Sequence, residues 1–189
     1  LMEQLLADKR LGTDDIWERL RRLLEAKKLG AAKATAAYLP VGQAPSAKTL
    51  DAIADKPLRH LALLPPNFAA SRQGREMALF AVQRLARTDP AQAAQQWEGI
   101  RDKFSAADGA YIYAQLGWQA ALRHLPEALA WYAKAGSAPL SDEQVAWKVR
   151  AALRAQNWAV VGEAIGQMPK ALQAQPDWIY WLGRAHEAL

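Results

Sequence analysis

The side chains that most often carry chemistry in proteins are isolated from one another in this sequence of 189 residues. Each of the three histidines, His60, His124 and His186, lacks a second histidine four residues away, so the spacing of a zinc-binding helix is absent. There is no cysteine, which excludes disulfides, thiol nucleophiles and cysteine-bound metal clusters. We therefore predict no metal site and interpret the histidines as residues of turns and helix surfaces.

The acidic residues show no pattern typical of a catalytic pair. A general acid needs a shielded pocket that raises its pKa, and Glu98, Glu127, Glu143 and Glu163 each fall on what we expect to be an exposed helix face. Neither a glycine-rich phosphate loop nor the elbow of a serine nucleophile is present. We predict no catalytic residue and no cofactor in this chain.

Aromatic residues near the C-terminal end of the chain are the ones that could contact a ligand. Tryptophan and tyrosine rings stack on sugars and on bases, so Trp178, Tyr180 and Trp181 could form a glycan-contact surface or a platform for nucleic acid. We favour packing between helices as their main role, because the tryptophans follow the spacing of the predicted helical pairs. Four of the eight tryptophans lie within residues 141–189: Trp147, Trp158, Trp178 and Trp181.

Composition bounds the class of protein to which the chain belongs. Hydrophobic residues make up 51% of the chain and charged residues 23%, as in globular proteins with a sizeable core. The net charge of +5 favours anionic partners. No apolar run approaches the roughly 18 residues that cross a bilayer. Residues 1–10 resemble the end of a helix, and we interpret the chain as part of a longer protein.

Apolar residues recur at helical spacing throughout, and no segment alternates as a strand would. We expect Thr13 to cap the first complete helix and Gly30 to end it. Ser141 and Gln144 have the spacing of a capping box. Further helices are expected near residues 31–39, 47–55, 57–63, 71–86, 90–103, 106–123, 127–135, 142–156, 158–167 and from 177 onward.

Pairs of helices repeat along the chain. Residues 120–131 can be aligned with residues 151–162 at an offset of 31, and a similar unit is visible at 22–40. The alanines Ala130, Ala133, Ala159 and Ala164 would let neighbouring helices approach closely. A period of about 31–34 residues is typical of tetratricopeptide-like repeats. We predict an all-α fold, a right-handed α-superhelix or solenoid of tetratricopeptide-like hairpins, in a single domain over residues 1–189.

Several runs of residues resemble the superhelical region of the soluble lytic murein transglycosylases of the Slt type. The strongest similarity lies in residues 147–153, followed by Asn157-Trp158, Met168-Pro169 and residues 177–185. Weaker similarity continues towards the other end of the chain, at residues 17–23 and 80–87.

The resemblance implies a function for the longer protein. Enzymes of this family are periplasmic and cleave peptidoglycan glycan strands without water, forming a 1,6-anhydro product. Their α-helical ring holds a C-terminal lysozyme-like domain, in which the glutamate of a Glu-Ser motif, followed by Gly-Leu-Met-Gln, is the acid and then the base. Neither motif occurs here. The resemblance therefore implies a non-catalytic helical scaffold whose partners are peptidoglycan strands and the enzyme's own catalytic domain.

Two other functions remain open from the residues alone. A tetratricopeptide-like module that binds other proteins would have the same helical pattern. A basic helical domain that binds nucleic acid is less favoured, because the arginines form no continuous stripe interleaved with aromatic residues.

Overall fold

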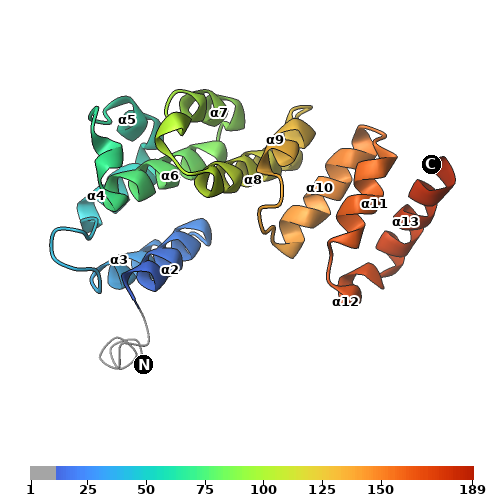
Figure 1. Cartoon of the computed structure of the whole chain (residues 1–189), viewed down its shortest axis with the longest axis horizontal. Coiled ribbons are helices and arrows are strands. Elements are labelled where there is room, and N and C mark those ends of the chain that lie inside the picture. The colour runs from blue at the N-terminus through green and yellow to red at the C-terminus, as the bar shows by residue number, and fades with distance from the viewer. Residues whose placement is uncertain (1–11) are drawn as a thin grey trace. The chain divides into compact units, whose positions relative to one another are not determined.

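The computed structural model describes residues 12–189, so the helix expected at residues 1–10 lies outside the described part. Every regular element in residues 12–189 is a helix, and none is a strand, which confirms the all-α prediction (Figure 1). The chain divides into two compact units. In the described part, the N-terminal unit comprises residues 12–88 with 95–104, and the C-terminal unit comprises residues 89–94 with 105–189. The single domain and the right-handed superhelix stay predictions.

The N-terminal unit is built around the long helix α6. Its buried side is mostly apolar but also holds Glu76 and Gln83. Ser71 caps the helix by accepting a hydrogen bond from the Gly74 N–H at 3.0 Å. Helices α2, α4 and α5 pack against α6. The rings of Trp97 and Phe104 lie 5.0 Å apart and add an aromatic cluster to this unit. The elements assigned to this unit are α2 (Thr13–Glu25), α3 (Leu29–Ala36), α4 (Ala47–Asp55), α5 (Pro57–Ala62), the 3-10 turn η1 (Phe68–Ala70), α6 (Arg72–Ala86) and the 3-10 turn η2 (Arg101–Lys103).

The C-terminal unit consists of helical hairpins that follow one another along the chain. Helix α8 (Ala106–Leu122) pairs with α9 (Ala128–Ala135), and α10 (Asp142–Arg154) pairs with α11 (Trp158–Gly166). A short α12 (Lys170–Gln173) leads to α13 (Pro176–Ala188), which packs on α11 (Figure 1). One core lies within this last group of helices: Val145, Val149, Ala152, Val161, Ala164, Ile165, Met168, Trp178 and Ala185.

The hairpins share one kind of turn. Lys27, His124 and Gln156 have positive φ angles of 61°, 59° and 53°, at the ends of α2, α8 and α10. The next N–H in each case donates to a carbonyl five residues back, as in Leu125 to Ala120 and Asn157 to Ala152, both at 2.9 Å. The turns at His124 and Gln156 are 32 residues apart, so the offset of 31 differs by one residue from the structural offset. The sequence alignment matched residue types, whereas the structural alignment matches the residues with a left-handed conformation in each turn.

Several predicted helix ends were also wrong. Gly12, not Thr13, precedes the first turn of α2, and its N–H donates to the Asp15 carboxylate at 2.7 Å. Gly30 lies inside α3, because Lys27 has already adopted the left-handed conformation that we assigned to a glycine. Helix α7 spans Pro90–Glu98 and does not reach residue 103.

Close packing in the C-terminal unit depends on other small residues than those predicted. Ala164 is buried, as expected, but Ala130, Ala133 and Ala159 are exposed. The close approach is instead at Gly117 of α8, where an added Cβ would lie 2.9 Å from the ring of Tyr132 in α9. The Tyr132 hydroxyl then donates to the Gln144 carbonyl of α10 at 2.9 Å, so one side chain connects three helices.

Candidate functional site: an arginine between two indoles

Helix α10 places a basic and aromatic surface on the C-terminal unit. Ser141 and Gln144 form the predicted capping box, with hydrogen bonds of 3.2 and 2.8 Å. Val145 and Val149 face the core, four residues apart on one side of the helix. Trp147 and Arg150 are spaced three residues apart, which brings their side chains together on another side.

The side chain of Arg150 lies over two tryptophan rings. Its guanidinium carbon is 5.0 Å from the ring centre of Trp147 and 5.4 Å from that of Trp178 in α13. Both distances are within the range of a cation–π interaction. The two indoles make no ring contact with each other, and Arg150 itself is exposed to solvent. The arginine therefore joins α10 to α13 while its edge stays accessible.

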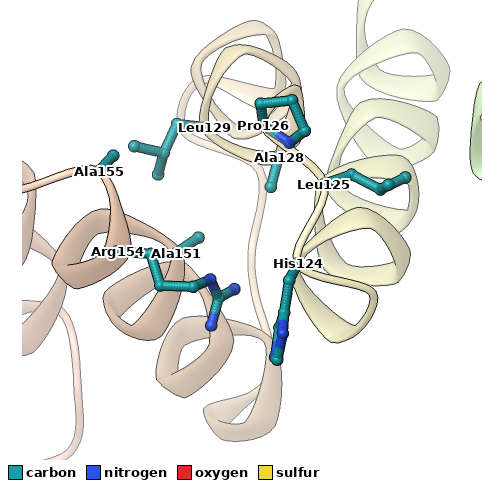
Figure 2. A pocket seen from close by; sticks show the side chains of 8 residues that line it. All are labelled: His124, Leu125, Pro126, Ala128, Leu129, Ala151, Arg154 and Ala155. Carbon is teal, nitrogen blue, oxygen red and sulfur yellow. The ribbon is translucent and has the colours of Figure 1, made fainter.

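A hollow at the turn between α8 and α9 lies near the same surface. It has a volume of about 250 Å³ and has a polar end, formed by His124 and Arg154, and an apolar end. Figure 2 shows the Arg154 guanidinium and the His124 ring turned toward the same opening. The ring of His124 is also 6.5 Å from that of Trp147. The apolar lining consists of Leu125, Pro126, Ala128, Leu129, Ala151 and Ala155.

The Arg154 guanidinium already has a structural partner. Its Nη2 donates to the Ala121 carbonyl at 2.9 Å, near the end of α8. Desolvation, and secondly the charge of Arg150, lower the pKa of Arg154 below its ordinary value. Arg154 thus stabilises a helix end and adds positive potential beside Arg150.

A second hollow, of about 280 Å³, lies within the N-terminal unit. Two arginines of its lining also donate hydrogen bonds to main-chain carbonyls. Arg84 donates from Nε to the Ala54 carbonyl at 2.9 Å, and Arg87 donates to the Glu25 carbonyl. Both carbonyls are at helix ends, where main-chain acceptors lack a partner within the helix. We interpret these arginines as structural caps.

The three predicted glycan-contact residues have different environments in α13. Trp178 is 7% exposed and belongs to the core of the unit. Tyr180 is 58% exposed, and the half-buried ring of Trp181 meets it edge-on at 5.0 Å. Of the three predicted residues, Tyr180 is therefore exposed to solvent, Trp181 is partly exposed and Trp178 is buried. Their contact with glycan stays a prediction.

The other residues considered for chemistry do not come together in one site. Glu98 pairs with Arg101 at 3.1 Å at the surface, and the exposed Glu163 pairs with the buried Lys148 at 3.3 Å. His60 is half-buried, and desolvation lowers its pKa. Within residues 12–189, no cluster of three or more histidines and acids could hold a metal ion. None of the helices in that range is long and apolar enough to cross a membrane.

Sequence reasoning missed a buried carboxylate in the N-terminal unit. Glu76 of α6 receives two hydrogen bonds from Arg21 of α2, at 2.9 and 3.0 Å, and lies 3.7 Å from Arg72. Its two cationic partners make Glu76 a link between α2 and α6. The pairing joins residues 55 positions apart, which no local pattern reveals.

Sequence reasoning also missed Arg150 and Trp147 as members of a site. The signal was available in part, since a tryptophan and an arginine three apart share a helix face. The contribution of Trp178 depends on the packing of α13 and could not be read from spacing.

The comparisons with known proteins agree with this helical architecture. No model of a protein family matches the chain, and no curated protein matches it. Among solved structures, it is similar to an inactive mutant of the lytic transglycosylase Slt from Pseudomonas aeruginosa, with a TM-score of 0.69 and 22% identity. The match covers 98% of this chain and 30% of that one. The structural neighbour is thus of the type that the sequence resembles, and the chain has the fold of part of a Slt lytic transglycosylase.

Proposed function

We propose that the chain is a non-catalytic helical region of a Slt-type lytic transglycosylase, a periplasmic enzyme of peptidoglycan turnover. The single observation that carries the proposal is the structural match, which takes in 98% of this chain at a TM-score of 0.69. The chain spans 30% of the length of the matched structure, so the activity would belong to the longer protein and to a domain outside these residues.

The side chains of the described residues support a contact role over a catalytic one. The buried Glu76 is held by arginines, and the four glutamates considered above are exposed. The accessible groups of the C-terminal unit include Arg150 and the ring of Tyr180, which suit a polymer that carries sugars and carboxylates. We infer that the region supports the enzyme's catalytic domain and contacts its substrate.

Incubation with purified sacculi tests this role. We expect the chain to sediment with the sacculi and to release no 1,6-anhydromuropeptide above the background of a heat-denatured sample. Release of that product would contradict a non-catalytic region, and absence of sedimentation would restrict the role to scaffolding.

The reading frame downstream of Leu189 tests the identity of the parent enzyme. A Glu-Ser motif followed by Gly-Leu-Met-Gln within the next few hundred codons is expected. A different domain there would favour the alternative, a tetratricopeptide-like module that binds other proteins.

A further inference from the structure

We propose that Arg150 is a binding site for a carboxylate group, with the indoles of Trp147 and Trp178 holding its guanidinium in place. The ligand class is a carboxylate on a flexible chain, such as a peptide terminus. This deepens the proposed function, on which it rests only for the source of the carboxylate, the peptide stems of peptidoglycan.

Contact with the two indoles leaves the donors of the arginine unused. Arg150 makes no hydrogen bond with another side chain or carbonyl of residues 12–189, and no carboxylate in that range lies within 4.0 Å of it. A cation–π contact uses the positive charge of the guanidinium and not its five N–H groups, which project in its plane and can still donate hydrogen bonds. An incoming anion can therefore bind without displacing a partner.

Most other arginines with resolved contacts are already engaged. Arg21 is paired with Glu76 and Arg184 with Glu187, at 2.9 and 2.6 Å. Arg154 donates to a carbonyl near the end of α8. Arg150 differs from these arginines in three ways. Its side chain is exposed, two tryptophan rings hold it in place, and no acceptor within residues 12–189 pairs with its guanidinium.

Fixed position reduces the entropy that binding would otherwise cost. A free arginine side chain loses rotamer freedom when it binds an anion, and the contacts with Trp147 and Trp178 restrict it beforehand. The positive charge of Arg154 nearby adds an attraction for anions without competing for the same atoms.

The flat environment favours carboxylate over phosphate. A carboxylate is planar, so both oxygens can meet two N–H groups of the guanidinium in its own plane. A tetrahedral phosphate also places oxygens above and below that plane, and it needs more room beside a guanidinium carbon that lies 5.0 and 5.4 Å from the ring centres of Trp147 and Trp178. We therefore expect the site to prefer a carboxylate.

The test is a titration followed by NMR of the arginine Nε–H groups of the full chain. The probes are N-acetyl-alanine, its uncharged amide, and inorganic phosphate, all at constant ionic strength. We expect the Arg150 resonance to shift and saturate with N-acetyl-alanine, and to shift at least threefold less with the amide or with phosphate at the same concentration. Equal shifts with all three, or a larger shift with phosphate, would overturn the proposal.

Matched variants separate geometry from charge. The indole N–H resonance of Trp147, which the variants keep, reports on the site in place of the arginine resonance. Arg150→Gln should abolish its saturable shift, and Arg150→Lys should weaken binding at least threefold, because a lysine cannot form the paired hydrogen bonds. Arg19→Gln removes the same charge from an exposed position on α2 and should leave binding unchanged. An equal loss in Arg19→Gln would show that only net charge matters. The two proposals can be told apart, because the probes here are small molecules. The chain could bind sacculi without binding N-acetyl-alanine at Arg150, and it could bind N-acetyl-alanine without binding sacculi.

Discussion

At the scale of single residues, two glycines are required by close contacts with a neighbour and not by a turn. Gly117 admits the ring of Tyr132, and Gly74 admits the main chain of η1. An added Cβ at Gly74 would lie 1.9 Å from the carbonyl oxygen of Phe68, and a backbone atom cannot move away as a side-chain end can. The position therefore fixes how η1 joins α6.

Gly74→Ala should lower the free energy of unfolding by about 1–3 kcal/mol, the range of overpacked sites. The measurement is urea denaturation followed by circular dichroism. Gly183→Ala is the control: its added Cβ meets nothing within 4 Å, and alanine should stabilise that helix by about 0.5–1 kcal/mol. A neutral Gly74→Ala variant would show that η1 can be displaced freely.

Tyr132 gives the C-terminal unit a dependence on alkaline pH. Desolvation, and secondly the negative charge of Glu143, raise the pKa of Tyr132 above its ordinary value of 10.0. The folded state therefore favours the neutral hydroxyl, and the unfolded state loses its proton first. This contribution to stability is complete below pH 10 and decreases as the pH rises above it.

Tyr132→Phe should accordingly reduce the loss of stability between about pH 10 and 11. At pH 7 the same change should cost about 1 kcal/mol, because the Gln144 carbonyl loses its hydrogen bond. Thermal unfolding at a series of pH values measures both effects. Tyr180→Phe, at an exposed position, should leave the alkaline slope as it is; an identical slope in Tyr132→Phe and the wild type would contradict the assignment.

At the scale of the elements, the hairpin turns carry strain. Lys27, His124 and Gln156 adopt the left-handed conformation, which costs a residue other than glycine about 1–2 kcal/mol. Glycine would remove that cost, although it also gains more freedom in the unfolded chain. The hairpins therefore have room for stabilisation at these positions.

We expect Gln156→Gly to raise the free energy of unfolding by about 0.5–1 kcal/mol, the balance of these two terms. The neighbouring Ala155 has helical dihedral angles, so Ala155→Gly should instead destabilise by a similar amount. Denaturant midpoints of the two variants measure the difference. The same sign for both would show that turn conformation does not decide stability here.

Helical periodicity predicted most elements of the fold, because apolar spacing and capping residues are local signals. Ser71, Ser141 and Asn157 cap their helices by accepting main-chain hydrogen bonds. The ends of α2 near Lys27 and of α7 at Glu98 were not predicted. A left-handed lysine and the 3-10 turn that follows α7 have no characteristic residue type that the sequence could reveal. Of the candidate site, Trp178 was named as a possible sugar-stacking residue with packing between helices favoured, and the structure places it in the core beside Arg150.

At the scale of the whole molecule, the two compact units differ in the polar and cation–π interactions that connect their helices. The N-terminal unit uses an ion pair between α2 and α6, and the C-terminal unit uses the Tyr132 hydroxyl and the Arg150 contacts. The residues of α7 are divided between them, because residues 89–94 belong to one unit and residues 95–104 to the other. Because a helix forms cooperatively, we expect the loss of one half of α7 to destabilise the other half.

From this shared helix we expect a single cooperative unfolding transition, in line with the predicted single domain. Urea denaturation should give the same midpoint by circular dichroism and by tryptophan fluorescence, since the buried indoles of Trp17 and Trp178 report on different units. Gly74→Ala and Tyr132→Phe, one in each unit, should each move that common midpoint. Two separate transitions, each moved by one variant alone, would instead establish two domains that fold independently, because α7 would then not couple their stabilities.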